Sequence, residues 1–251
     1  MPVSIRVALS GANGRMGRVV GPGLESAAGI ALVARIEIGD DLVAACKAAK
    51  AEVVVDFTTP AAAVGNARKI LDAGCQGVIG TTGFSEADLV DLDARTRAAK
   101  RGSLVAPNFA LGAILAQRFA AEAARHFPRS EIVEYHHDGK VDAPSGTAIR
   151  TAEVVGAAGS GGGPGGGDGG GASRGSEHHG VRVHSVRLPG IVAHQEVLFG
   201  GVGELLTLRH DALSRECYVL GVVAAVRAMP GRVGLVRGLE SILFPTGPAA
   251  R

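Results

Sequence analysis

The sequence predicts an α/β protein in which a doubly wound parallel sheet is joined by an inserted α+β domain built on an open mixed sheet. Three observations predict this class. β-Branched runs alternate with helical segments over roughly the first hundred residues. A glycine-rich turn follows the first of these runs. Later in the chain the alternation stops, and strand-like segments follow one another.

The parallel sheet is predicted from the first half of the chain. We expect its strands where β-branched residues gather, at residues 3–9, 31–38, 52–57, 77–79 and 103–106. We expect its helices from the glycine-rich turn to about residue 28 and at residues 41–50, 61–73 and 88–100, with apolar residues at helical spacing in the third. Ser85, followed by Asp88, resembles a capping box that begins the last helix.

The second half follows a different order. We expect helices at residues 110–126, 147–157 and 218–229. We expect a strand at 130–135 and antiparallel strands joined by turns at 181–188, 195–200 and 204–210. A last strand or helical turn is expected within 234–244. Eleven of the sixteen residues 156–171 are glycine, a composition that cannot support a packed core and predicts a flexible surface loop. The expected domains are residues 1–108 with 222–251, and residues 109–221 inserted between them.

Composition excludes several classes of protein. The formal charge is only +2 and the basic residues are scattered, so no basic face for nucleic acid is expected. No apolar run reaches membrane-spanning length, and the N-terminus lacks the features of a signal peptide. Cys46, Cys75 and Cys217 have no CxxC spacing, so neither a disulfide framework nor a metal site is predicted. We therefore expect a cytoplasmic location.

Gly11, Gly14 and Gly17 stand directly after the first strand in G-x-x-G-x-x-G spacing, a variant of the Rossmann-type dinucleotide fingerprint. Glycine permits the turn and a close approach to pyrophosphate, which the N-terminus of the next helix would bind. Glu37 closes the second strand, where an acid can bind ribose hydroxyls. The alternatives are a purely structural glycine turn and a surface carboxylate beside Gly39.

The cofactor preference stays open between NADH and NADPH. A carboxylate at Glu37 would repel a 2′-phosphate and favour NADH, whereas Arg15 or Arg35 could offset that phosphate. Three more strand ends, DFTTP (56–60), GTTGF (80–84) and APNFALG (106–112), share the carboxyl edge of the sheet, where ligands bind in such folds. Each could equally be a plain turn.

The segment EIVEYHHDGKVDAPSGTA (131–148) combines a proton donor with anion-binding groups. A histidine is accessible in both protonation states near neutral pH, and Lys140 supplies a compact positive charge. Ser145-Gly146-Thr147 begin a helix whose N–H groups suit a carboxylate. One of His136 and His137 could instead be structural, because adjacent strand residues point to opposite faces. Lys140 could be a solvated surface residue, and Asp142 is expected to brace the turn.

Together the motifs GANGRMG, VVDFTTP, GTTGF, APNFALG, HHxxKxDAPSGTA and VRLPGIVAHQEVLFG resemble the 4-hydroxy-tetrahydrodipicolinate reductase (dihydrodipicolinate reductase) family, in order from about Val3 to Leu243. The resemblance implies an NADH- or NADPH-dependent oxidoreductase of the diaminopimelate route to lysine, acting on a small dicarboxylate. It also implies a homotetramer assembled through the sheet of the second domain. Residues 109–221 would then bind substrate and join subunits, and the other domain would bind the dinucleotide.

The resemblance also implies roles for individual residues. His136 would be the proton donor and, with Lys140, catalytic; His137, Lys140, Ser145, Gly146 and Thr147 would hold the substrate. The cofactor cleft would comprise Gly11, Asn13, Gly14, Arg15, Met16, Gly17, Glu37, Phe57, Gly80, Thr81, Thr82, Ala106, Pro107, Asn108 and Phe109. Asn13 stands where some relatives carry a basic residue or glycine, so no particular contact of its side chain is implied.

Other histidines and two alternative functions complete the expectations. His178 and His179 are expected in a solvated loop, and His184, His194 and His210 in packing or interface roles, although Arg187, His194 or Glu196 could reach the active site. Another two-domain dehydrogenase, acting on aspartate or homoserine, would share the glycine loop but not HHxxKxDAPSGTA. A non-catalytic nucleotide sensor on the same fold would bind the cofactor without turnover.

Overall fold

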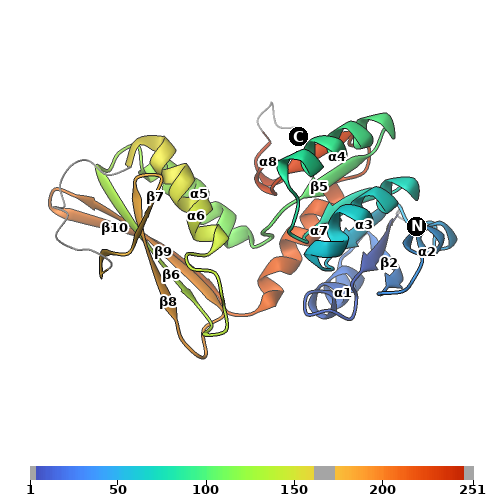
Figure 1. Ribbon diagram of the computed structural model, residues 1–251, viewed down its shortest axis with the longest axis horizontal. Helices are drawn as coiled ribbons and strands as arrows, with labels where there is room; N and C mark the ends of the chain where they lie inside the picture. The colour runs from blue at the N-terminus through green and yellow to red at the C-terminus, as the bar shows by residue number, and fades with distance from the viewer. Residues whose placement is uncertain (1–3, 161–172, 246–251) are drawn as a thin grey trace. The chain divides into compact units, whose positions relative to one another are not determined.

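The computed structural model describes residues 4–160 and 173–245, which form two compact units. Unit 1 comprises Met1–Ala110 and Arg215–Arg251, and unit 2 comprises Leu111–Ser214. Figure 1 labels the helices and strands of both units and colours the chain by residue number. Among the described residues no helix is long and apolar enough to cross a membrane, and no cluster of metal-binding side chains is found.

Unit 1 is built on a parallel sheet of six strands within the described residues. In sheet order these are β11 (Gly234–Arg237), β5 (Gly102–Val105), β4 (Gln76–Ile79), β3 (Val53–Asp56), β1 (Ile5–Ser10) and β2 (Ile30–Ile36). All five neighbouring pairs run parallel. The predicted doubly wound sheet is therefore confirmed, with β11 added to its edge by the returning chain.

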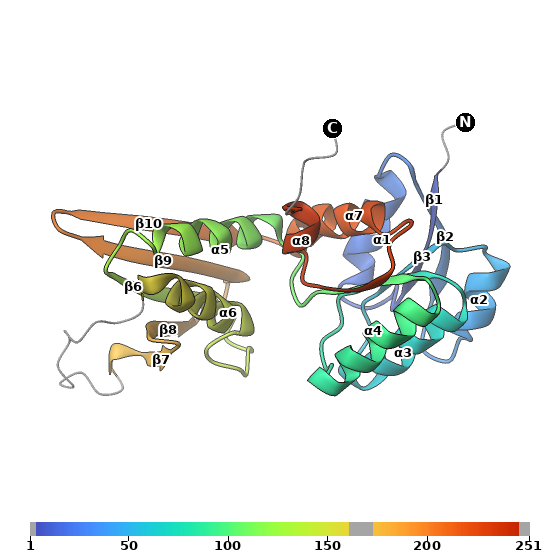
Figure 2. The same cartoon turned by 90° about the horizontal axis from the view of Figure 1, so that it is seen from above.

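Helices cover both faces of this sheet. α1 (Gly17–Ser26) and α7 (Val219–Ala228) lie on one face, and α2 (Leu42–Ala48), α3 (Pro60–Asp72) and α4 (Glu86–Ala98) on the other (Figure 2). The short α8 (Glu240–Leu243) follows β11. The layer of α2, α3 and α4 packs on the sheet around a core that includes Val54, Ile70 and Ile79. Both faces of the strands are therefore apolar, as expected for a buried parallel sheet.

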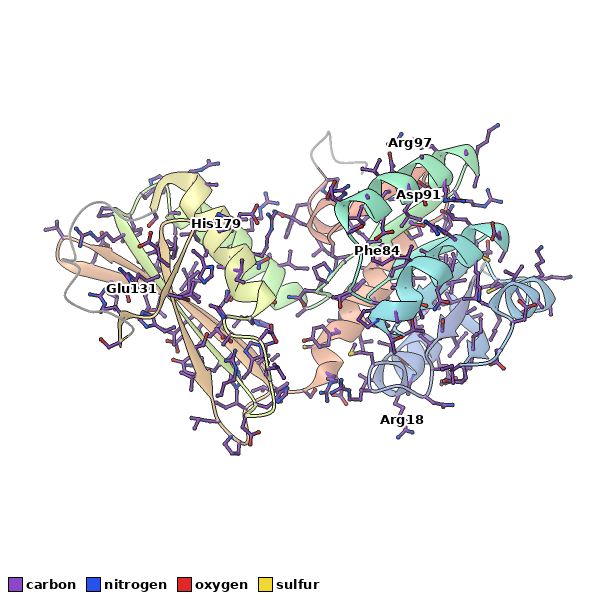
Figure 3. All side chains as sticks on the ribbon, viewed as in Figure 1. Arg18, Phe84, Asp91, Arg97, Glu131 and His179 are labelled. Carbon is purple, nitrogen blue, oxygen red and sulfur yellow. The ribbon has the colours of Figure 1, made fainter. Side chains whose placement is uncertain are left out.

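The predicted capping box of α4 is confirmed. The Ser85 hydroxyl accepts from the backbone N–H of Asp88, whose carboxylate accepts from the N–H of Ser85. Along the same helix, Arg95 pairs with Asp91 and Arg97 with Asp93 at four-residue spacing. Asp91 and Arg97 are labelled on α4 in Figure 3. This helix is therefore defined by local interactions that the sequence makes visible.

The strand register of unit 1 aligns the four predicted turns. Ser10 at the end of β1 lies opposite Asp56 of β3, Asp56 lies opposite Ile79 of β4, and Ile79 lies opposite Val105 of β5. The segments that follow these residues therefore leave the sheet side by side at its carboxyl edge. This is the edge at which open α/β sheets bind ligands.

Unit 2 contains a mixed sheet of five strands in the described residues. Their order is β10 (Glu204–Ala212), β9 (Ala193–Gly201), β6 (Arg129–His136), β8 (Val181–Arg187) and β7 (Ser176–His178). β6 runs parallel to β8 and antiparallel to β9. α5 (Leu111–Ala123) and α6 (Gly146–Val155) pack on one face against residues such as Ile132 and Phe199.

Three expectations for unit 2 need correction. The segments 181–188 and 195–200 are not neighbouring strands, because β6 lies between β8 and β9. His178 lies in strand β7 rather than in a loop. The first part of the glycine tract, Gly156–Ser160, is a π-helical turn with a buried Ser160, whose carbonyl accepts from Ser130; residues 161–172 lie outside the described residues.

Candidate active site

The turn after β1 is closed by glycines that a larger residue could not replace. Gly11 has a φ of +76°, and a Cβ there would lie 2.4 Å from the carbonyl oxygen of Phe57. A Cβ on Gly17 would lie 2.2 Å from the carbonyl oxygen of Gly11, to which Gly14 N–H also donates. α1 begins at Gly17, so its electropositive N-terminus faces this tight turn. The loop therefore fits a pyrophosphate, which must approach bare backbone.

A cavity of about 370 Å³ opens beside this turn. The residues that line it include Ser10, Gly11, Gly14, Glu37, Asp40, Phe57 and Lys69. The Glu37 carboxylate accepts a hydrogen bond from the backbone N–H of Asn13, and Asp40 accepts one from the N–H of Glu37 at 2.8 Å. Two carboxylates thus stand at the end of β2, where ribose hydroxyls are bound in Rossmann-type folds.

The two arginines that could have offset a 2′-phosphate do not line this cavity. Arg35 pairs with Glu25 at 2.8 Å instead, and its guanidinium packs over Gly21. Arg15 is exposed to solvent. Lys69 is a cation that does line the cavity, together with the two carboxylates of Glu37 and Asp40.

A buried carboxylate joins two of the strand-end turns. Asp56 is fully buried at the end of β3 and accepts hydrogen bonds from the hydroxyls of Thr81 (2.7 Å) and Thr58 (2.9 Å) and from the amide of Asn66 (2.9 Å). The backbone N–H of Thr58 in turn donates to Thr81 at 2.8 Å. The DFTTP and GTTGF segments are therefore held together by one polar network, which fixes Thr81 as a structural partner of the first turn.

A second cavity, of about 220 Å³, gathers most of the remaining cofactor candidates. It is lined by Met16, Phe57, Gly80, Pro107, Asn108, Phe109, Arg215 and Tyr218. The rings of Phe57 and Phe109 meet edge to face, with centroids 5.7 Å apart. A Cβ on Gly80 would lie 2.0 Å from the Phe57 ring, so only glycine lets this ring occupy its place. Ala106 is buried, and its backbone N–H donates a hydrogen bond to the carbonyl oxygen of Ile79.

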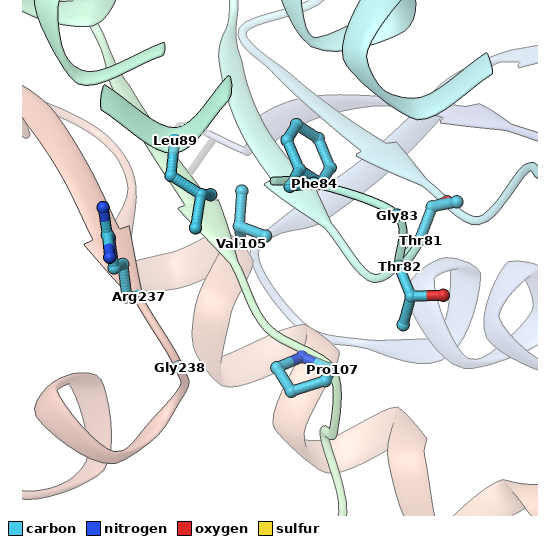
Figure 4. A pocket seen from close by; sticks show the side chains of 9 residues that line it. All are labelled: Thr81, Thr82, Gly83, Phe84, Leu89, Val105, Pro107, Arg237 and Gly238. Carbon is cyan, nitrogen blue, oxygen red and sulfur yellow. The ribbon is translucent and has the colours of Figure 1, made fainter. Parts of the chain in front are cut away.

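A third cavity, of about 280 Å³, lies between the GTTGF turn and the last strand (Figure 4). Thr82, Phe84, Leu89, Val105 and Pro107 line it, and Arg237 borders it. The guanidinium of Arg237 is held by both carboxylate oxygens of Glu86, at 2.8 and 2.9 Å. Thr81 and Thr82 both line this mainly apolar space, and Thr81 also belongs to the buried Asp56 network.

In unit 2, His136 closes strand β6 and contacts a buried carboxylate. Its Nδ1 is hydrogen-bonded to Glu134, whose side chain is completely buried. Arg187, at the end of β8, donates to the other Glu134 oxygen at 2.8 Å. Burial acts to raise the pKa of Glu134, but hydrogen bonds from His136, Arg187 and Ser185 hold it at about 2. Glu134 is therefore an ionised carboxylate inside the protein.

Lys140 lies in the loop after β6, and its Nζ donates to Asp142 at 2.6 Å. This contact holds the pKa of Asp142 below its usual range. The backbone carbonyl of Asp142 accepts from Arg187 at 2.7 Å. His136, Lys140 and Arg187 are thus brought together by two acidic residues in a part of unit 2 where the sequence predicted chemistry.

The helix that follows this loop, α6, begins with a capped N-terminal turn. Ser145 is the N-cap of α6, and its hydroxyl accepts from the N–H of Ala148 at 3.2 Å. Gly146 and Thr147 are the first helical residues, so their N–H groups have no partner inside the helix. A Cβ on Gly146 would meet nothing within 4 Å, so there is room beside it. This end suits a carboxylate group.

Two further histidines, His184 and His194, contact acidic residues outside this cluster. His137 follows the end of β6, so the alternation of a regular strand does not determine its direction. The Nε2 of His184 is hydrogen-bonded to the Glu131 carboxylate, which accepts at 2.8 Å, and His194 lies 2.9 Å from Asp211. Glu196 pairs with Arg209. Of the three residues named as possible contributors to the site, Arg187 contacts Glu134 and Asp142 of this cluster, whereas His194 and Glu196 pair with Asp211 and Arg209 of β10.

Sequence reasoning missed Glu134, Arg215 and Tyr218. Glu134 could have been found, because it stands two residues before His136 and side chains at that spacing share a face of a strand. Arg215 and Tyr218 come from a 3₁₀ helix more than a hundred residues beyond Gly80 in the chain, so no local pattern connects them to the cavity they line.

Comparison with known proteins places these observations in a family. The model of the dihydrodipicolinate reductase N-terminus matches residues 5–109, and that of its C-terminus matches residues 112–243. The 4-hydroxy-tetrahydrodipicolinate reductase of Moorella thermoacetica is 47% identical to this chain, and the match covers 97% of this chain and 99% of the relative. The 4-hydroxy-tetrahydrodipicolinate reductase of Coxiella burnetii is 42% identical, and the match covers 96% of this chain and 100% of the relative. The dipicolinate-bound dihydrodipicolinate reductase from Paenisporosarcina sp. TG-14 superposes with a TM-score of 0.85 at 37% identity, over 96% of this chain and 100% of its own.

Proposed function

The chain belongs to the dihydrodipicolinate reductase family, and we propose from this that it reduces 4-hydroxy-tetrahydrodipicolinate to tetrahydrodipicolinate with NADH or NADPH, in the diaminopimelate route to lysine. The observation that carries the proposal is the match to both halves of the family, which spans nearly the whole chain. The reaction consumes one hydride and one proton and releases one water. Substrate and product are both small dicarboxylates.

The residues of unit 1 fit a reduced dinucleotide. The Gly11–Gly17 turn leaves backbone bare for a pyrophosphate, and Glu37 stands where ribose hydroxyls bind. Phe57, Gly80 and Phe109 shape the smaller cavity, which suits a flat ring. When bound, the reduced nicotinamide supplies the hydride.

The residues of unit 2 fit the substrate. Lys140 and the N-terminal end of α6, with Ser145, Gly146 and Thr147, would hold its carboxylates by charge and by backbone N–H groups. His136 would supply the proton from the ring nitrogen that does not contact Glu134. The positive charge of Lys140 also stabilises the negative charge that builds on the substrate ring when hydride arrives.

The first experiment measures oxidation of NADH and of NADPH, with substrate produced in place from pyruvate and aspartate semialdehyde by a synthase. We expect oxidation that depends on the synthase and is inhibited by pyridine-2,6-dicarboxylate. We also expect a higher kcat/KM with NADH, because Glu37 and Asp40 would repel a 2′-phosphate. Cofactor binding without oxidation would favour the nucleotide sensor, and a higher kcat/KM with NADPH would refute the role given to Glu37.

We also propose that the chain forms a homotetramer through the sheet face of unit 2 that lies opposite α5 and α6. Tyr135, Leu198 and Leu205 alternate with the core residues of β6, β9 and β10, and Leu205 is 68% exposed. β10 is also an edge strand nine residues long. Exposed apolar side chains beside a long edge strand are typical of a site of association.

Light scattering coupled to gel filtration tests this assembly. Wild type is expected at four times the chain mass, and Leu205→Arg at a lower mass, because the new charge would be buried without a partner. Val90→Arg is the matched control, since Val90 is a similarly exposed apolar residue on α4 of unit 1. A monomeric wild type, or an unaffected Leu205→Arg, would contradict the proposal.

A further inference from the structure

Glu134 is a completely buried carboxylate that contacts two basic side chains. It lies on β6 two residues before His136, so both side chains point to the same face of the strand. One of its oxygens is bonded to His136 Nδ1, and the other accepts from Arg187 at 2.8 Å. An ionised carboxylate is costly to bury unless its oxygens are hydrogen-bonded and its charge is compensated. The two basic partners compensate the buried charge of Glu134, which indicates that the charge itself has a role in the site.

We propose that Glu134 is a positioning residue for proton transfer: it accepts the Nδ1–H of His136, fixes the ring, and leaves Nε2 as the nitrogen that gives its proton to the substrate. This rests on the proposed function. An ordinary strand histidine could rotate its ring or carry its proton on either nitrogen. The buried carboxylate selects one orientation and one tautomer, as carboxylate partners of histidine do in other enzymes.

The proton transfer balances without any protonation of Glu134. The Nε2–H bond of the imidazolium breaks, its electron pair stays on the ring, and the proton forms a C–H bond at the carbon next to the imine carbon of the hydride-bearing substrate. His136 becomes a neutral ring that still donates Nδ1–H to Glu134. A carboxyl with a pKa of about 2 stays ionised at neutral pH, so it stabilises the imidazolium before the transfer.

Arg187 links this carboxylate to the substrate loop. Its guanidinium donates to Glu134 and also to the backbone carbonyl of Asp142, whose carboxylate holds Lys140. The proton donor and the lysine are therefore positioned through one continuous set of contacts. In the described part of the chain, the charged groups shown beside His136 are Glu134 on its own strand and Arg187, its partner in register on β8. Lys140 and Asp142 are linked to them through Arg187.

Glu134→Gln tests the proposal, because Arg187 determines how the new amide lies. Arg187 can only donate, so the amide oxygen must face it and the NH₂ group must face His136. Nδ1 then has to accept, which moves the proton of the neutral ring to Nε2 and disfavours the imidazolium. We expect kcat to fall by roughly a hundredfold to ten-thousandfold, with unchanged NADH affinity, and the alkaline limb of the pH–kcat profile to move to lower pH.

Glu131→Gln is the matched control. Glu131 lies on the same strand three residues earlier, on the sheet of unit 2 (Figure 3), and it also pairs with a histidine and an arginine, His184 and Arg174. Its variant should keep the wild-type kcat and pH profile. Glu134→Asp, which keeps the charge on a shorter side chain, should recover part of the turnover lost in Glu134→Gln. It also provides the kinetic test if the glutamine variant fails to fold.

Nitrogen NMR of ¹⁵N-histidine-labelled protein gives a readout that does not depend on activity. We expect neutral His136 to carry its proton on Nδ1 in wild type and in Glu131→Gln, and on Nε2 in Glu134→Gln. An unchanged tautomer with wild-type kcat in Glu134→Gln would overturn the role of Glu134. A wild type that shows the Nδ1–H tautomer but no reductase activity would instead overturn the proposed function, so the two failures are distinguishable.

Discussion

His136→Gln is expected to lower kcat by roughly a hundredfold to ten-thousandfold while leaving NADH affinity unchanged. Glutamine can still accept and donate hydrogen bonds, but it cannot carry a proton that it releases to a substrate near neutral pH. The nucleotide loop belongs to unit 1, whereas His136 closes β6 of unit 2, so the substitution should not reach the loop. Steady-state kinetics and a fluorescence titration with NADH measure the two effects separately.

His184→Gln is the matched control for this substitution. His184 is also a strand histidine that contacts a glutamate of β6, with 2.8 Å between its Nε2 and Glu131. We expect its variant to keep the wild-type kcat. If His136→Gln lost NADH affinity and turnover by the same factor, the proton-donor role would be wrong, because a general loss of structure would explain both changes.

Gly17→Ala is expected to weaken NADH binding by at least about tenfold and to destabilise the protein by about 1–3 kcal/mol. The added Cβ would lie 2.2 Å from the carbonyl oxygen of Gly11 and 2.4 Å from that of Ala12. Both atoms are backbone, so the turn itself must move rather than a flexible side chain. A displaced turn no longer directs its N–H groups to one pyrophosphate.

Gly65→Ala supplies the control for this prediction. Gly65 is exposed inside α3, and a Cβ there would meet nothing within 4 Å. Alanine should stabilise the protein by about 0.5–1 kcal/mol and leave NADH binding unchanged, because it is the better helix former. Urea unfolding and NADH titration compare the two variants, and a Gly17→Ala protein that binds NADH like wild type would refute the account of the loop.

The elements of unit 1 were predictable because each carries its own signal. The β-branched run of β3 and the Ser85–Asp88 capping box of α4 depend only on neighbouring residues. The neighbours of β8 in unit 2 were not predictable, because alternation identifies a strand but not its partners. β6 reaches its place between β8 and β9 by pairing with segments far along the chain, for which a single sequence gives no signal.

The candidate site, like the fold, was predictable from the sequence only in part. The motifs around Gly11 and His136 indicated where chemistry is concentrated, because glycine loops and histidine–lysine segments have recognisable spacing. The partner of His136 was missed although Glu134 is only two residues away, because an acidic residue in a strand is usually a solvated one. Only the structure shows that Glu134 is buried and that Arg187, from another strand, compensates its charge.

The interrupted path of the chain through unit 1 has a consequence for how the protein is made. β11, which pairs with β5 at the sheet edge, and α7, which packs on α1, are synthesised only after all of unit 2. Unit 2 is a continuous segment, so a growing chain has its five strands available before unit 1 can be completed. Until then β5 presents an unpaired edge, and the nascent chain depends on prompt synthesis of its last segment to protect that edge from aggregation.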